Sequence, residues 1–129
     1  MAPPTGRATV FVLDDDDAVR DALTTALRSA GFAAAAFRSA AEFIEGHRSG
    51  GPACLVVDLE LPDIDALLCQ LPAAAAGLPV IVTSRRLRRR RLPDELAQCV
   101  GLLEKPFGHD ELMVLLRAAL RLEASPSDT

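Results

Sequence analysis

The chain has 129 residues, which is the size of one ordinary domain and enough to bury a hydrophobic core without disulfide or metal support. Half of the residues are hydrophobic, but there is no Trp or Tyr and only five Phe, so Ala, Leu and Val must fill that core. The net charge of −4 argues against a domain built wholly to bind nucleic acid.

Three further features indicate the compartment. The three Cys are odd in number and widely spaced, which is typical of small buried side chains in a reducing environment. Residues 1–7 lack the apolar stretch of a secretory signal, and no run approaches the 18 apolar residues that a membrane span needs. We therefore expect a cytoplasmic protein without membrane contact, with a flexible N-terminus over 1–7 and a polar tail over 124–129.

Apolar runs and helical periodicities alternate along the chain. Strands are predicted over residues 9–13, 32–37, 54–58, 79–83 and 101–104. Helices are predicted over residues 18–30, 39–48, 65–71 and 110–123. Right-handed crossovers between such units give an α/β fold, a doubly wound parallel sheet with helices on both faces. For five strands the flavodoxin-like (βα)5 order 2-1-3-4-5 is favoured.

The fourth helix is the exception to this regular pattern. Six of the thirteen Arg lie between Arg85 and Arg91, and at helical spacing they surround the whole wheel and leave no apolar face. Pro93 is typical of a new helix start, so we expect a mobile basic loop and a shortened fourth helix over 93–99. The arginines suit a phosphate backbone or an acidic protein partner, but solvated charge on a loop is the favoured interpretation.

Polar residues stand where the predicted strands end. Asp14 and Asp15 end the first strand, Asp58 the third, Thr83 the fourth and Lys105 the fifth. In this topology all five converge on one edge of the sheet, which is where such sheets bind ligands. Three crowded carboxylates repel one another unless a cation neutralises them, and hard oxygen ligands suit Mg²⁺.

This arrangement predicts phosphoryl transfer to a protein carboxylate. A metal can clamp phosphoryl oxygens while Asp58 attacks as a nucleophile. Lys105 would supply a further positive charge and the Thr83 hydroxyl a hydrogen bond. The competing interpretations are a solvated turn for Asp58 and, for the four-Asp run from Asp14 to Asp17, an acid-rich turn that favours the helix dipole.

Four segments in this order carry a family resemblance: Val-Phe-Val-Leu-Asp-Asp at 10–15, Val-Asp-Leu-Glu-Leu-Pro-Asp at 57–63, Val-Ile-Val-Thr-Ser at 80–84 and Glu-Lys-Pro-Phe at 104–107. Together they resemble a CheY-like response-regulator receiver domain, over residues 8–123. Gly31-Phe32 and Phe-Arg-Ser-Ala at 37–40 add similarity to the FixJ-type branch, whose receivers usually precede a helix-turn-helix domain.

The resemblance implies roles for individual residues. Asp58 would accept a phosphoryl group from a sensor histidine kinase or a phosphotransfer protein, and Thr83 and Lys105 would contact that group. Asp14 and Asp15, the latter directly, would hold Mg²⁺ with Asp58 and the backbone carbonyl of Glu60.

The resemblance further implies a cis Lys105-Pro106 bond and a signalling switch rather than an enzyme. Nucleic acid would be contacted only through an output domain that is absent from this chain. A weak homodimer is a further expectation, with Met113, Arg117 and Arg121 as candidate contacts.

The sequence also departs from the family. Ala66 replaces a usual Gly, which would strain the turn if that residue needs a positive φ. Leu102 replaces a frequent Tyr or Phe, so the usual aromatic signal of phosphorylation cannot operate. Together with the Arg run, these departures prompt one alternative, a degenerate receiver that acts by protein contact without phosphorylation.

A second alternative is a small phosphatase of the haloacid-dehalogenase type with Asp14 as nucleophile. Finally, Glu60 and Arg85 each lie two residues beyond a site residue. We expect their side chains to flank the mouth of the site, and either to pair across it or to remain independently solvated.

Overall fold

A computed structural model describes residues 8–46, 51–74, 78–86, 91–97 and 99–120, so the predictions for residues 1–7, 87–90 and 121–129 lie outside the described residues. The strands are β1 (Thr9–Leu13), β2 (Ala33–Phe37), β3 (Ala53–Asp58), β4 (Val80–Ser84) and β5 (Gly101–Glu104). The helices are α1 (Asp17–Ser29), α2 (Ala40–Gly46), α3 (Ile64–Ala74), the 3-10 helix η2 (Asp94–Leu96) and α4 (His109–Leu120). All strand pairs are parallel in the order β2-β1-β3-β4-β5, which confirms the predicted fold.

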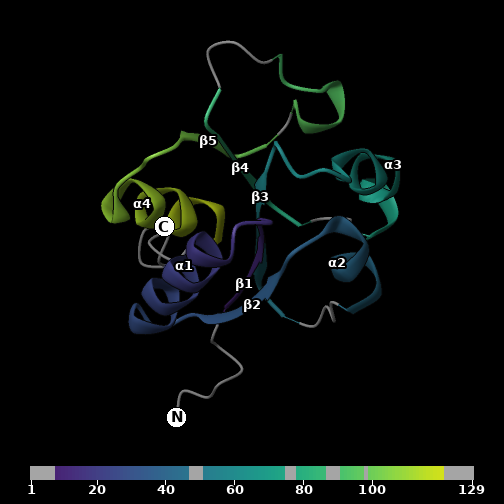
Figure 1. The fold of residues 1–129 in the computed structure, drawn as a ribbon. Helices are drawn as coiled ribbons and strands as arrows, with labels where there is room; N and C mark the ends of the chain where they lie inside the picture. Colours follow the sequence, from purple (N-terminus) through teal and green to yellow (C-terminus); the bar gives the residue numbers. More distant parts are fainter. Residues whose placement is uncertain (1–7, 47–50, 75–77, 87–90, 98, 121–129) are drawn as a thin grey trace, which may run out of the picture.

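The sheet separates two layers of helices, with α1 and α4 on one face and α2 and α3 on the other (Figure 1). Side chains alternate along each strand. In β1, Val10 and Val12 join the core under α1 and α4, whereas Phe11 and Leu13 join the core under α2 and α3. Because both faces are covered, the central strands are apolar at successive positions, as the sequence indicated.

Side-chain caps fix where the first two helices begin. Asp16 caps α1, and its Oδ1 accepts hydrogen bonds from the backbone N–H groups of Ala18 (2.9 Å) and Val19 (3.2 Å). Ser39 Oγ accepts from the Glu42 backbone N–H at 3.1 Å, which is half of the predicted capping box. The Glu42 carboxylate accepts from the backbone N–H of Arg38 at 2.9 Å.

Helix α3 is longer than predicted at both ends. It begins at Ile64 and continues past Pro72 to Ala74, where the sequence suggested a connector after Leu71. Alanine has the highest helix propensity, so the Ala residues after Pro72 extend the helix. Ala66 lies in the first turn of α3 and has helical backbone geometry, so the expected strain at this position is absent.

The fourth helix is shorter than the prediction of residues 93–99. The described residues form a single 3-10 turn at Asp94–Leu96, closed by the hydrogen bond from the Leu96 N–H to the Pro93 carbonyl at 2.9 Å. Leu96 is 2 % exposed and packs in the core under α3, whereas Val100, four residues later, is 44 % exposed. Leu92 and Cys99, which flank the turn, are only partly buried against the same core, so little apolar surface supports further helical turns.

Helix α4 begins one residue before the prediction and packs closely on β5. A Cβ at Gly101 would lie 2.6 Å from a methyl carbon of Leu115, so a larger residue here would require the Leu115 side chain to shift. Met113 is 5 % exposed and belongs to the core, which corrects its assignment as a dimer contact. The adjacent Val114 is 62 % exposed instead. Within the described ranges, no helix is long and apolar enough to cross a membrane.

Candidate acidic site at the carboxyl edge of the sheet

Strand register places the predicted carboxylates side by side. Leu13 of β1 is in register with Val57 of β3, so Asp14 and Asp58 follow at the same level. Asp14 is 2 % and Asp58 5 % exposed, whereas Asp15 is exposed. One carboxylate oxygen from each of the three lies within 4.8 Å of the others. The structure therefore brings these predicted metal-ligating residues together.

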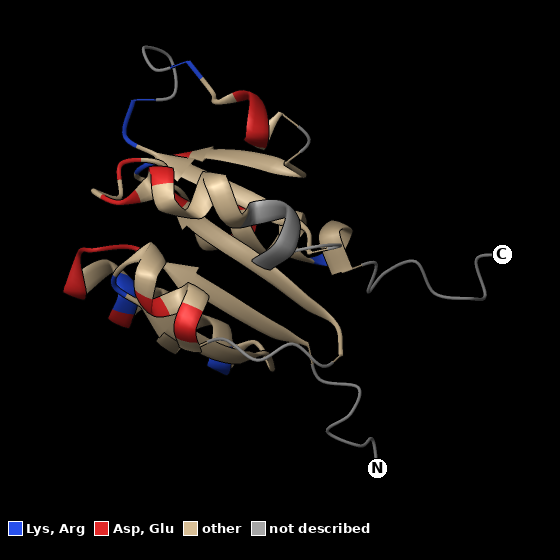
Figure 2. Cartoon of the chain, turned by 90° about the vertical axis from the view of Figure 1, so that its right-hand side faces the viewer, with Lys and Arg blue, Asp and Glu red and all other residues tan. Residues whose placement is uncertain are grey.

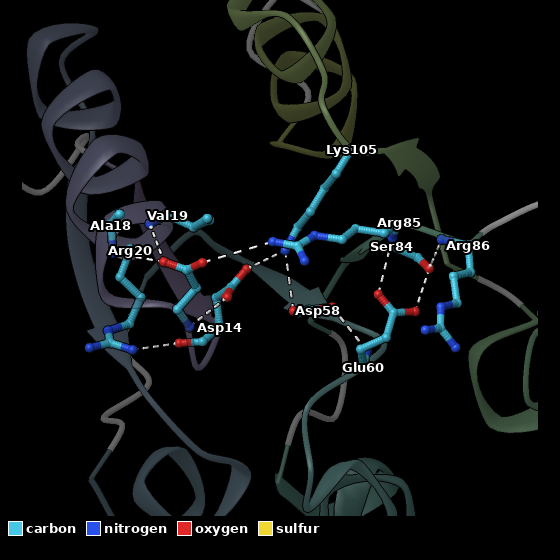
Figure 3. Close-up of polar contacts among 11 residues, drawn as sticks. Asp14, Ala18, Val19, Arg20, Asp58, Glu60, Ser84, Arg85, Arg86 and Lys105 are labelled. Atoms are coloured by element: carbon cyan, nitrogen blue, oxygen red, sulfur yellow. Dashed lines mark hydrogen bonds and ion pairs between the residues drawn. The ribbon is translucent and has the colours of Figure 1, made fainter.

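Lys105 reaches the same point from the end of β5. Its Nζ donates to Asp14 Oδ2 at 2.7 Å and to Asp58 Oδ2 at 3.2 Å (Figure 3). The side chain is only 10 % exposed. The Lys105-Pro106 peptide bond is cis, as predicted. An ammonium group thus neutralises part of the charge of the two buried carboxylates.

Backbone N–H groups bind the other oxygens of these two aspartates. Asp16 N–H donates to Asp14 Oδ1 and Glu60 N–H donates to Asp58 Oδ1, both at 2.9 Å. Arg20 fixes the backbone of the loop after β1, because its Nη1 donates to the Asp14 carbonyl oxygen at 2.7 Å. Each of the two buried carboxylates therefore accepts a hydrogen bond on both of its oxygens.

The surroundings shift two pKa values. Burial raises the pKa of Asp58; the Glu60 N–H bond and the Lys105 charge oppose this, and the nearby charge of Asp14 adds to it. Burial alone would lower the pKa of Lys105, but its bond to Asp14 and the charges of both aspartates outweigh burial and raise it. Lys105 therefore stays protonated at neutral pH.

The site opens as a pocket of about 420 Å³. Its lining combines five acids with three basic side chains: Asp14, Asp15, Asp16, Asp58, Glu60, Arg85, Arg86 and Lys105. Figure 2 shows acidic residues gathered at this edge of the sheet. A pocket of this size and composition can admit a hydrated cation and a small anion together.

Thr83 differs from the other predicted site residues. It is paired with Asp58 in the β3–β4 register, but it is only 2 % exposed and does not belong to the described pocket lining. Its carbonyl accepts the Leu59 N–H at 2.8 Å. The contact of its hydroxyl with a phosphoryl group stays a prediction.

Glu60 and Arg85 both line the pocket, as expected, but their side chains do not pair with each other. Glu60 Oε1 accepts the backbone N–H of Arg85 at 3.0 Å, and Oε2 accepts the hydroxyl of Ser84. The Arg85 guanidinium lies 3.9 Å from Asp16 Oδ2 instead. Sequence spacing indicated that the two loops meet, but it cannot tell a main-chain donor from a side-chain donor.

Sequence reasoning missed several residues around the site. Asp16 was noticed only as one of four acids, although an Asp just before a helix is a recognisable cap signal. Ser84 and Arg86 had no local signal as site residues. Arg20 could not be found at all, because its acceptor is a backbone carbonyl six residues earlier.

The fold and this carboxylate–lysine cluster define the class of protein, a CheY-like receiver domain of two-component systems. Residues 10–117 match the family described as response regulator receiver domain, and the chain belongs to that family. It is a family of signalling proteins.

Named relatives agree with this assignment. The response regulator TodT of Pseudomonas putida is 32 % identical over 116 residues, which cover 88 % of this chain and 51 % of TodT. The transcriptional regulatory protein FixJ of Bradyrhizobium diazoefficiens is 30 % identical, covering 95 % of this chain and 61 % of FixJ. The solved structure of the response regulator StyR superposes with a TM-score of 0.79 at 34 % identity, covering 92 % of this chain and 61 % of that one. This chain thus spans about half to three fifths of these proteins.

Proposed function

We propose that Asp58 accepts a phosphoryl group from a phosphohistidine of a sensor kinase or phosphotransfer protein. The observation that carries this proposal is the fixed carboxylate of Asp58, with Glu60 N–H on one oxygen and Lys105 Nζ on the other. In the transfer, the phosphorus–nitrogen bond of the donor breaks as a bond from an Asp58 oxygen to phosphorus forms. The imidazole leaves with the electron pair and is protonated from solvent.

Mg²⁺ fits the donor set of this pocket. Asp14, Asp15 and Asp58 offer clustered carboxylate oxygens, and the backbone carbonyl of Glu60 would complete the protein ligands. When bound, the ion supplies positive charge to the phosphoryl oxygens. Lys105, which donates to Asp14 and Asp58, would contribute a second positive charge next to the phosphoryl group.

The phosphodonor partner has an adjoining surface on which to dock. A second hollow of about 480 Å³ lies between α1 and the start of the loop before α4. It is lined by Val19, Ala22, Leu23, Arg85, Lys105, Pro106 and Phe107. This hollow shares Arg85 and Lys105 with the acidic pocket, so a partner seated there lies next to Asp58.

We propose that residues 8–123 form a cytoplasmic receiver domain, which changes its protein contacts when Asp58 is phosphorylated. FixJ is described as a transcriptional regulator, and we propose that any DNA contact belongs to an output domain of that kind. The fixed geometry around Asp58 favours this function over a phosphorylation-independent receiver. A phosphatase that uses Asp14 as nucleophile is disfavoured, because it leaves the buried Asp58, which Lys105 also binds, without a role.

The test is intact-mass measurement after treatment with acetyl phosphate and Mg²⁺. The wild type should gain one phosphoryl adduct, which Asp58→Asn should lose and the exposed control Asp65→Asn should keep. Wild type without an adduct would leave the phosphorylation-independent receiver as the better account. Continuous phosphate release from small esters that depends on Asp14 would support the phosphatase.

A further inference from the structure

We propose that Arg85 is a second cationic phosphoryl-contacting residue of this site, held on Asp16 until the group arrives and positioned by Glu60. The inference rests on the proposed function, because it concerns transfer to Asp58. It assigns a role to the first residue of the arginine run, which the family resemblance leaves unexplained.

The backbone of Arg85 is fixed at the rim of the pocket. The Glu60 carboxylate accepts the Arg85 N–H at 3.0 Å and the Ser84 hydroxyl, and Ser84 Oγ accepts the Arg86 N–H at 2.9 Å. Glu60 in turn donates its own N–H to the carboxylate of Asp58. One residue therefore ties the phosphoacceptor to the segment that carries Arg85.

The side chain of Arg85, unlike its backbone, is only loosely held. Its Nη2 lies 3.9 Å from Asp16 Oδ2, and the two side chains are 67 % and 42 % exposed. Figure 3 shows Arg85 reaching from Ser84 toward the Asp14 side of the site. An exposed pair at this distance is weak, so the guanidinium can leave Asp16 at little cost.

The charges of the pocket favour such a move. Lys105 is already bound to Asp14 and Asp58, and an arriving phosphoryl group brings further negative charge. A guanidinium presents two parallel N–H donors that match two phosphoryl oxygens, which an ammonium cannot do. Arg85 lines both the acidic pocket and the adjoining apolar hollow, so it lies where the two meet.

The first experiment measures binding of beryllofluoride, an anion that mimics the phosphoryl group, by ¹⁹F NMR at fixed Mg²⁺. Arg85→Ala should weaken binding about 10-fold, the effect of one charge-assisted contact. Arg85→Lys should recover part of the loss, since it keeps the charge without the fork. Arg91→Ala is the matched control, an exposed arginine of the same run outside the described pocket lining, and it should bind like wild type.

The second experiment releases Arg85 from its resting partner. Asp16→Asn keeps the helix cap, because the cap uses Oδ1, and replaces the Oδ2 that faces Arg85. When Arg85 is present, Asp16→Asn should tighten beryllofluoride binding about 2-fold. When it is added to the Arg85→Ala variant, the affinity should not change. Asp21→Asn removes the same charge from an exposed position of α1 and controls for a general loss of negative charge.

The third measurement tests the positioning role of Glu60 without any ligand. Glu60→Ala removes both acceptor oxygens and keeps the backbone of residue 60, so amide hydrogen exchange at Arg85 should accelerate several-fold. Exchange at the amide of Asp16, which belongs to the other loop, should not change.

The outcomes separate the two proposals. Wild type that binds no beryllofluoride overturns the proposed function and this inference with it. Wild type that binds in an Asp58-dependent way, with Arg85→Ala equal to Arg91→Ala, overturns the role of Arg85 alone. A 2-fold gain from Asp16→Asn that persists in Arg85→Ala shows a general charge effect and contradicts the resting pair. Unchanged exchange in Glu60→Ala removes Glu60 as the positioning residue.

Discussion

The loops after β1 and β3 differ from the segment after β4 in how they are held. In the first two loops each buried aspartate accepts a hydrogen bond from a backbone N–H two residues later, as Asp14 does from Asp16. The segment after β4 depends on Glu60, 24 and 25 residues earlier in the chain, and on the burial of Leu96. Hydrogen bonds within local turns therefore fix the buried Asp14 and Asp58, whereas long-range contacts position the arginines at the rim of the pocket.

The largest effect is expected from replacing Lys105, which binds both Asp14 and Asp58. Lys105→Met leaves the carboxylates of Asp14 and Asp58 without their ammonium partner, which should cost about 3 kcal/mol of unfolding free energy at neutral pH. Urea denaturation would measure it, with Arg91→Met as an exposed control.

The pH dependence of this variant has a defined sign. Because the folded-state pKa of Lys105 is raised, its contribution is complete below pH about 10.5 and is lost as pH rises beyond the raised value. The difference between wild type and Lys105→Met should therefore shrink only in strong alkali. A difference that already shrinks between pH 7 and 9 would contradict the raised pKa.

The next largest effect is expected from replacing Leu96, which anchors the segment after β4 in the core. Leu96→Ala removes a core side chain and should cost about 2–3 kcal/mol, at the lower end for such a change because a 3-10 turn can collapse toward the cavity. Chemical denaturation measures the loss, and Glu95→Ala in the same exposed turn is the control. A cost below about 0.5 kcal/mol, which is typical of a surface substitution, would mean that Leu96 does not anchor the segment.

The sequence predicted the locally encoded part of the molecule better than the rest. Strand ends and the convergence of Asp14, Asp58 and Lys105 follow from short motifs and from the parallel topology, and the family resemblance adds the cis bond at Pro106. The helix predicted over 93–99 is longer than the turn at Asp94–Leu96, because the sequence shows the capping signals but not that Leu96 is the one buried side chain of the turn.

Pairings between distant side chains were the least predictable feature. Glu60 could bind either the side chain or the main chain of Arg85, and both satisfy the same spacing. Asp63 is a further example, since its two carboxylate oxygens accept the N–H groups of Ala40 (2.9 Å) and Ala41 (3.1 Å) at the start of α2. Such contacts depend on the orientation of two loops, which periodicity does not encode.

Asp63→Ala tests this long-range cap of α2. Loss of both acceptors should cost about 1–2 kcal/mol in unfolding free energy, the upper range for a helix cap. Ser39→Ala removes the local cap of the same helix and provides the comparison. If Ser39→Ala were the more costly change by thermal unfolding, the local cap would dominate.

Asp58→Asn should stabilise the metal-free protein by about 0.5–2 kcal/mol at neutral pH. Its raised pKa means that the ionised carboxylate is less favourable in the folded state, so this penalty is present at neutral pH. Below the ordinary aspartate value of 3.8 both states are protonated and the gain should vanish. Denaturation at pH 7 and pH 3 without Mg²⁺ measures the difference, and a destabilised variant at pH 7 would contradict the shift.

The smallest effect concerns Ala66, in the first turn of α3 just beyond the β3 loop. A positive φ at this position would make Ala66→Gly stabilising, because glycine alone adopts that backbone without strain. The helical backbone found here predicts the opposite sign, a loss of about 0.5–1 kcal/mol, because glycine gives up more chain entropy in a helix. Asp65→Gly, the exposed neighbour in the same turn, is the matched control and should lose a comparable amount. A gain in stability for Ala66→Gly alone, measured by thermal unfolding, would show that the loop after β3 carries strain after all.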